Sequence, residues 1–144
     1  MLGRGRAAPD SWRMSRTFTS TPGSFWIDAT ITSGQTYYYE LPVQDVTSIQ
    51  IAGDGVAAAT ITVQHTDFAF DLAGAAVTPT SGASASDARI WKDDPAIGSL
   101  SLAASTGSTG GVRVTFTNAP RRSTRVKVVA SATGRIVGNW SGIV

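Results

Sequence analysis

The chain contains no cysteine, which excludes a disulfide framework and a thiolate metal site. It has a single histidine, so any serine–histidine–aspartate arrangement would have to use His65. No apolar run approaches the roughly 20 residues of a membrane-spanning helix. The basic N-terminus lacks the apolar segment of a secretory signal. Charged residues are only 15% of the 144 residues, which fits one low-charge domain without a membrane partner.

What is present is the period-two alternation of half-buried strands, clearest over residues 111–144. Val112, Val114 and Phe116 alternate there with polar residues, and Pro120 interrupts the run. Two further alternating runs follow, at 125–130 and 135–140, with a turn at 132–134 between them. These runs predict an antiparallel meander.

Earlier runs with the same alternation lie at 25–31, 36–41, 46–52, 58–65 and 100–102. The turn residues 53–55 predict a hairpin between the third and fourth of these runs. The small-residue segment 73–88 predicts a long loop. About eight strands without a convincing helix predict an all-β protein, a single antiparallel β-sandwich of jelly-roll-like form.

The sequence before the first strand shows no sustained period and is rich in Gly, Pro, Ser and Arg. We therefore divide the chain into an extended basic N-terminal arm, residues 1–24, and a β-sandwich domain, residues 25–144. Trp12, Met14 and Phe18 are spaced along the arm as apolar anchors. The alternatives are a disordered tail and an arm that orders on contact with a partner.

Charge is unevenly distributed along the chain. Residues 1–16 hold four arginines and one acid (+3), residues 17–112 two basic residues and nine acids (−7), and residues 113–144 six basic residues and no acid (+6). Such a molecule is either bipolar in space, which favours head-to-tail contacts or docking on an acidic shell, or simply carries solvated strand faces. Without aromatic residues between the basic ones, we expect no nucleic-acid partner.

Three groups of residues could carry chemistry, and none is convincing. His65 lies near Asp67, a spacing that predicts a hydrogen bond at a strand end. Asp93 and Asp94 are adjacent, so on a strand they would point to opposite faces. Asp54 lies between two glycines without the other ligands of a calcium loop. The sequence therefore predicts no enzyme, no metal site and no cofactor.

The aromatic residues allow one functional hypothesis, a carbohydrate- or receptor-binding module. A sugar ring stacks on exposed aromatic faces, but such side chains more often pack in the fold. The candidates for this platform are Tyr37, Tyr38, Tyr39, Trp91 and Trp140.

The hairpin region SIQIAGDGVAAATITVQHTDF and the late pair GVRVTFTNAPRRSTRVKVVASATGRI, with the aromatic first strand Phe25-Trp26, resemble small β-sandwich virion proteins of tailed bacteriophages. The resemblance spans roughly residues 25–140. It implies a structural role, most simply a capsid decoration protein made in the host cytoplasm and bound to the capsid surface of the virion. Its partners would be the major capsid protein or other virion proteins, and the protein would form homo-oligomers such as trimers. The alternative that the resemblance leaves open is a carbohydrate- or receptor-binding module of a head fibre or tail.

On this hypothesis, contacts with the particle come from the arm and from the basic C-terminal strands. The residues expected to make these contacts are Arg4, Arg6, Trp12, Arg13, Arg16, Arg121, Arg122, Arg125 and Lys127.

Overall fold

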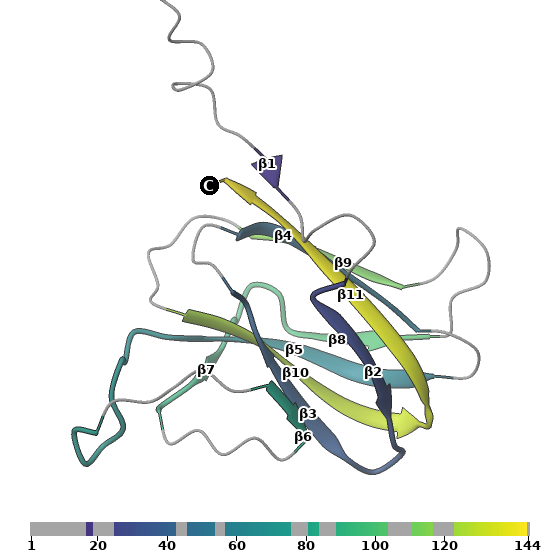
Figure 1. The fold of residues 1–144 in the computed structure, drawn as a ribbon, viewed down its shortest axis with the longest axis horizontal. Helices are drawn as coiled ribbons and strands as arrows, with labels where there is room; N and C mark the ends of the chain where they lie inside the picture. Colours follow the sequence, from purple (N-terminus) through teal and green to yellow (C-terminus); the bar gives the residue numbers. More distant parts are fainter. Residues whose placement is uncertain are drawn as a thin grey trace, which may run out of the picture.

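The computed structural model describes residues 17–18, 25–42, 46–53, 57–75, 81–83, 89–103, 111–116 and 123–143 (Figure 1). These residues form eleven β-strands and no helix. Sheet A contains β1 (Thr17–Phe18), β2 (Ile27–Ile31), β4 (Val46–Gly53), β9 (Val112–Thr115) and β11 (Gly134–Ile143). Sheet B contains β3 (Thr36–Glu40), β5 (Ala58–Thr66), β6 (Ser81–Ala83), β7 (Lys92–Asp93), β8 (Ser99–Leu102) and β10 (Ser123–Ala132).

The two sheets pack face to face, and every pairing between described strands is antiparallel. The eight strands of four or more residues lie in the order β2-β11-β4-β9 in sheet A and β3-β10-β5-β8 in sheet B. This arrangement is the double Greek key of a jelly roll. The predicted all-β, jelly-roll-like sandwich of about eight strands is therefore confirmed, with β1, β6 and β7 as short additional strands.

Two predicted local pairings are wrong. The strands of the expected hairpin, β4 and β5, lie in different sheets: β4 pairs with β9 and β11, and β5 pairs with β7, β8 and β10. The expected late meander does not form either, because β10 and β11 cross between sheets at Thr133 and β9 pairs with β4. The alternating pattern specifies which face of a strand is buried. It does not specify the sheet to which the strand belongs, because the apolar face is buried equally well in either sheet.

The core is the layer of side chains between the two sheets. This layer contains the aromatic side chains of Tyr37, Tyr39 and Trp140, in addition to aliphatic ones. Burying one large aliphatic side chain contributes about 1.5–3 kcal/mol, so the nine fully buried ones dominate the stability of the sandwich. These nine are Ile27, Ile31, Ile49, Ile51, Ile61, Ile136, Val63, Val126 and Val128.

One end of the sandwich is closed by a close approach of backbones. A Cβ atom added at Gly134 would lie 2.7 Å from the Ala57 Cβ and 2.8 Å from the Ala57 nitrogen. At Gly53, an added Cβ would lie 2.9 Å from the Ala57 carbonyl oxygen. Both glycines are required because Ala57, just before β5, lies directly against the ends of β4 and β11.

The predicted arm is described only at β1, which pairs with the end of β11 through Thr17–Ile143 and Phe18–Gly142. Among the described residues, basic side chains of the C-terminal part contact acidic side chains of the middle part, directly or through Gln64. The basic strands β10 and β11 lie within the two sheets, where Arg135 binds Asp28 and Arg125 joins a chain of hydrogen bonds to Asp93. Topology therefore mixes the charges of the acidic middle and the basic C-terminal part.

Candidate functional site

The outer side of sheet B carries a buried ion pair. Arg89 Nη2 donates to Glu40 Oε1 at 2.6 Å, and both side chains are almost fully buried. The indole N–H of Trp26 donates to the Glu40 backbone carbonyl at 3.0 Å, which ties β3 to the start of β2. Breaking such a pair is costly, because the remaining charge would stay buried without compensation.

Next to this pair, the guanidinium of Arg125 is stacked between two aromatic rings. Its Cζ lies 4.2 Å from the ring centroid of Tyr38 and 4.2 Å from that of Trp91. Arg125 Nε donates to Gln64 Oε1 at 2.8 Å, and Gln64 Nε2 donates to Asp93 Oδ1 at 2.8 Å. These contacts join β3, β5, β7 and β10 into one polar and aromatic layer over sheet B.

The single histidine lies at the inner edge of sheet B. His65 Nε2 donates to Asp94 Oδ2 at 2.7 Å, and His65 Nδ1 lies 2.8 Å from the Thr124 hydroxyl. The imidazole also packs edge-on against Phe116, which directly follows β9 of sheet A, with ring centroids 6.1 Å apart. The predicted pairing with Asp67 is wrong: that side chain is exposed, and Asp94 occupies the position instead.

The carboxylate of Asp94 is held in its ionised form. Burial acts to raise the pKa of Asp94, but the hydrogen bonds from His65 and from the backbone N–H groups of Ala96 and Ile97 outweigh it and lower the pKa overall. Thr124 is only 4% exposed, so its hydroxyl is not presented to a substrate. The contacts of His65 with Thr124 and Asp94 therefore hold β5, β10 and the segment after β7 together.

As predicted for adjacent aspartates, Asp93 and Asp94 serve different sides of the sheet. Asp93 accepts from Gln64 in the outer layer, and Asp94 accepts from His65 at the inner edge. Among the described residues, no group of three or more His, Asp or Glu side chains is placed to hold a metal ion.

The five aromatic candidates for a sugar platform are not assembled. Tyr37 and Tyr39 stack on each other within the core, with ring centroids 6.5 Å apart. Trp140 is buried in the same core. Only Tyr38 and Trp91 belong to the outer layer, and each has one ring face occupied by Arg125. Alternation along β3 directs Tyr37 and Tyr39 inward and Tyr38 outward. The carbohydrate-binding hypothesis stays a prediction, with Tyr38 and Trp91 as the candidates that lie in the outer layer.

Most of the residues expected to bind a partner lie outside the described residues: Arg4, Arg6, Trp12, Arg13, Arg16, Arg121 and Arg122. Lys127 lies on β10, opposite Tyr38 and Thr62, and is half-buried. Arg125 is buried and committed to the internal contacts above. Its guanidinium is therefore engaged within the domain, and its role in binding a partner stays a prediction.

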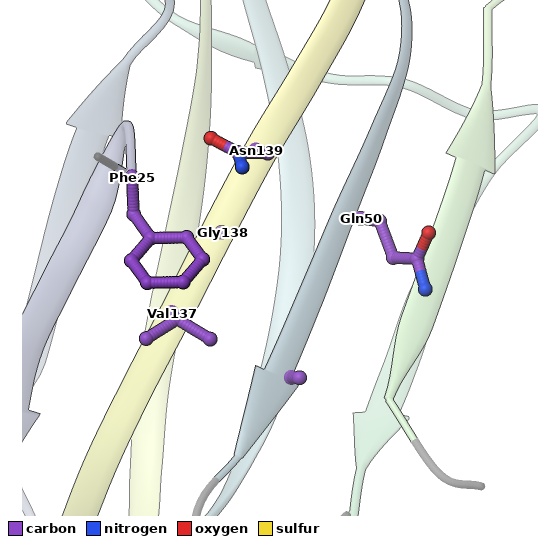
Figure 2. A pocket seen from close by; sticks show the side chains of 6 residues that line it. Phe25, Gln50, Val137, Gly138 and Asn139 are labelled. Atoms are coloured by element: carbon purple, nitrogen blue, oxygen red, sulfur yellow. The ribbon is translucent and has the colours of Figure 1, made fainter. Parts of the chain in front are cut away.

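The outer face of sheet A has a shallow depression that the sequence did not predict. It has a volume of about 220 Å³ and is lined by Phe25, Gln50, Ala52, Val137, Gly138 and Asn139. Figure 2 shows the ring of Phe25 lying over β11 beside Val137, with Asn139 further along the same strand. Small residues on β4 and β11 leave this space open. Phe25 precedes β2 and is 44% exposed, so its face is available.

A second unpredicted surface is the loop that follows β5. Phe68, Phe70 and Leu72 are 44%, 51% and 78% exposed. The loop projects away from both sheets (Figure 1). In the sequence these three side chains stand at every second position, which is the pattern of a short strand segment. No neighbouring strand among the described residues buries these three side chains.

Comparison of the chain with protein-family models, with curated proteins and with solved structures finds no match. In the part of the chain that the structure describes, none of the segments is a helix long and apolar enough to cross a membrane.

Proposed function

We propose that this chain is a non-enzymatic structural protein of a bacteriophage particle, which decorates and stabilises the outside of the capsid. The observation that carries the proposal is the pairing of β1 with β11, which attaches the N-terminal segment to a jelly-roll domain. Jelly rolls are common in viral capsid proteins, and the fold agrees with the one that the sequence resemblance implies.

The role of the arm follows from its charge and its attachment. Residues 1–16 carry four arginines and one aspartate, and the strand that follows them is joined to sheet A by backbone pairing. A basic segment held at one place on a stable domain suits an acidic shell, because the domain fixes where its charges can act. The buried position of Arg125 makes the arm, with Arg121 and Arg122, the main source of such charge.

The experiment compares the full chain with a variant that lacks residues 1–20, using phage particles that do not carry this protein. We expect the full chain to saturate the particles in a co-sedimentation assay and the shortened variant to lose binding. We expect thermal unfolding to change little, because the strand pairing that the deletion removes from the described part of sheet A is limited to the two residue pairs of β1.

A full-length variant with Arg4, Arg6, Arg13 and Arg16 replaced by serine is the matched control, since it keeps β1 and removes only charge. It should bind more weakly than the unaltered chain at low salt. A shortened protein that still saturates the particles, or a cryo-electron-microscopy map without repeated density over the capsid lattice, would overturn the proposal.

A further inference from the structure

The exposed loop after β5 is ordered at its tip, although its apolar side chains face solvent. Asp71 Oδ1 accepts hydrogen bonds from the backbone N–H groups of Ala73 and Ala75, each at 2.9 Å. The Asp71 N–H donates to the Ala75 carbonyl at 2.9 Å, and Gly74 has a left-handed φ of 86°. A preformed tip loses little conformational entropy on binding, so it is suited to insertion into a partner.

The depression on sheet A matches this tip in size and in polarity. Its volume of about 220 Å³ exceeds the roughly 150 Å³ of an apolar cavity that accepts benzene, so it has room for one leucine or phenylalanine side chain. Its floor is formed by Ala52, Val137 and Gly138, and its wall by the ring of Phe25. Leu72, the most exposed of the large apolar side chains described, is the natural occupant.

The charges around the two surfaces are opposite. The loop carries Asp67 and Asp71, and no basic residue lies between positions 67 and 75. Arg113 on β9 pairs in register with Gln50, which lines the depression, and the Arg135 guanidinium lies 5.9 Å from the centroid of the Phe25 ring. Among the residues that the structure describes, Asp28 forms an ion pair with only one of these two arginines, so the rim formed by the described residues is basic.

One chain cannot join its own two surfaces. The loop continues from β5 in sheet B and projects away from the sandwich (Figure 1), whereas the depression lies on the outer face of sheet A. The two packed sheets, about 10 Å apart, separate these faces. A contact between different patches on identical chains is head-to-tail, and it closes into a ring or extends along a surface.

We propose that the loop around Phe70 and Leu72 of one copy inserts into the depression beside Phe25 on a second copy of this chain. The contact is a property of the protein alone and does not depend on the virion role. The experiment measures the mass of the purified full chain by sedimentation velocity, from micromolar to millimolar concentrations. The mean mass should rise with concentration and fall when salt is added.

Two variants remove one side of the contact each. Leu72→Glu places a charge at the loop tip, and Ala52→Glu fills and charges the depression. Each variant alone should remain monomeric where the unaltered chain associates. A mixture of the two should form one-to-one dimers, because one variant keeps its depression and the other keeps its loop. Thr60→Glu, on the exposed face of β5, is the charge-matched control and should associate like the unaltered chain.

Three results of these experiments would overturn the proposed contact. An unaltered chain that stays monomeric throughout the concentration series overturns the proposal. So does association that Leu72→Glu abolishes and Ala52→Glu leaves intact, because that pattern indicates a loop-to-loop contact. A mixture that remains monomeric also contradicts it. Matching unfolding temperatures of the variants exclude misfolding as the cause of lost association.

Discussion

The imidazole of His65 and the carboxylate of Asp94 are joined by a hydrogen bond of 2.7 Å, although 29 residues separate them in the sequence. This bond fixes the segment after β7 against β5. It is also the contact that the sequence assigned to the wrong acid, since Asp67 is nearer along the chain. Its contribution to stability can be measured directly.

We expect Asp94→Asn to lower the free energy of unfolding at pH 7 by about 1.5–3 kcal/mol, the usual range for a hydrogen bond to a charged group. The folded-state pKa of Asp94 lies below its ordinary value, so its contribution is complete above about pH 4 and is lost as the pH falls through the lowered pKa. Urea unfolding at pH 7 and pH 3 should therefore show a difference between variant and unaltered chain that shrinks at pH 3. Asp67→Asn, the control, should change little at either pH; an equal effect of both substitutions would contradict the assignment.

Because Glu40 and Arg89 form a buried ion pair, we expect one conservative substitution in the pair to lower the stability strongly. Glu40→Gln should lower the free energy of unfolding by about 3–5 kcal/mol, because the buried guanidinium loses the carboxylate that balances its charge. Denaturant titration at pH 7 measures this loss. Replacing both partners, Glu40→Leu with Arg89→Met, should recover much of it.

The control for this substitution is the exposed pair of Asp28 and Arg135. Both side chains are about half exposed, so Asp28→Asn should change the unfolding curve only slightly. If both carboxylates prove equally dispensable, the Glu40 pair does not have the buried character that we assign to it.

Because Ala57 lies directly against Gly134 at one end of the sandwich, we expect that position 134 does not tolerate a side chain. Gly134→Ala would place its Cβ 2.7–2.9 Å from three atoms of Ala57, two of which belong to the backbone. Overpacking of this kind costs about 1–3 kcal/mol, so thermal unfolding should begin several degrees lower. Ser131→Ala, at an exposed position near the same end of β10, should leave the melting temperature almost unchanged. A Gly134→Ala variant as stable as Ser131→Ala would show that Ala57 is not in close contact with β11.

Alkaline titration tests the inward orientation of Tyr39. Burial, with a smaller effect from Tyr37, raises the pKa of Tyr39 to about 12. An unfolded tyrosine has a pKa of about 10, so the stability that Tyr39 contributes is complete below pH 10 and is lost as the pH rises towards 12. Urea unfolding between these pH values should show a smaller alkaline loss for Tyr39→Phe than for the unaltered chain. Tyr38→Phe should keep the full loss, because it leaves the buried phenol in place.

The sequence was sufficient to predict the strands and their inward faces, but not their partners. Ile49, Ile51, Ile61 and Val63 all face the core as their alternation predicts. Even so, β4 and β5 lie in different sheets, since a turn of glycines permits a crossing as readily as a hairpin. Long-range contacts decide between these outcomes, and a local pattern does not contain them.

The candidate surfaces were harder to predict than the fold. The buried state of Arg125 depends on Tyr38, Gln64 and Trp91, which come from three separate segments. The depression exists because Ala52 and Gly138, on neighbouring strands, both have small side chains. These two residues lie close together only because of the register between β4 and β11. Single positions in a sequence do not show such combinations.

The central positions of β10 and β11 also have a consequence for biosynthesis. When residues 25–116 have left the ribosome, strands of both sheets are present in the nascent chain. At that stage β11, which pairs with β2 and β4, and β10, which pairs with β3 and β5, are still missing. Neither sheet can be completed before residues 123–143 leave the exit tunnel, although β4 can already pair with β9 and β5 with β8. Folding must therefore follow translation of this late segment, and until then the nascent chain exposes unpaired strand edges that chaperones would have to cover.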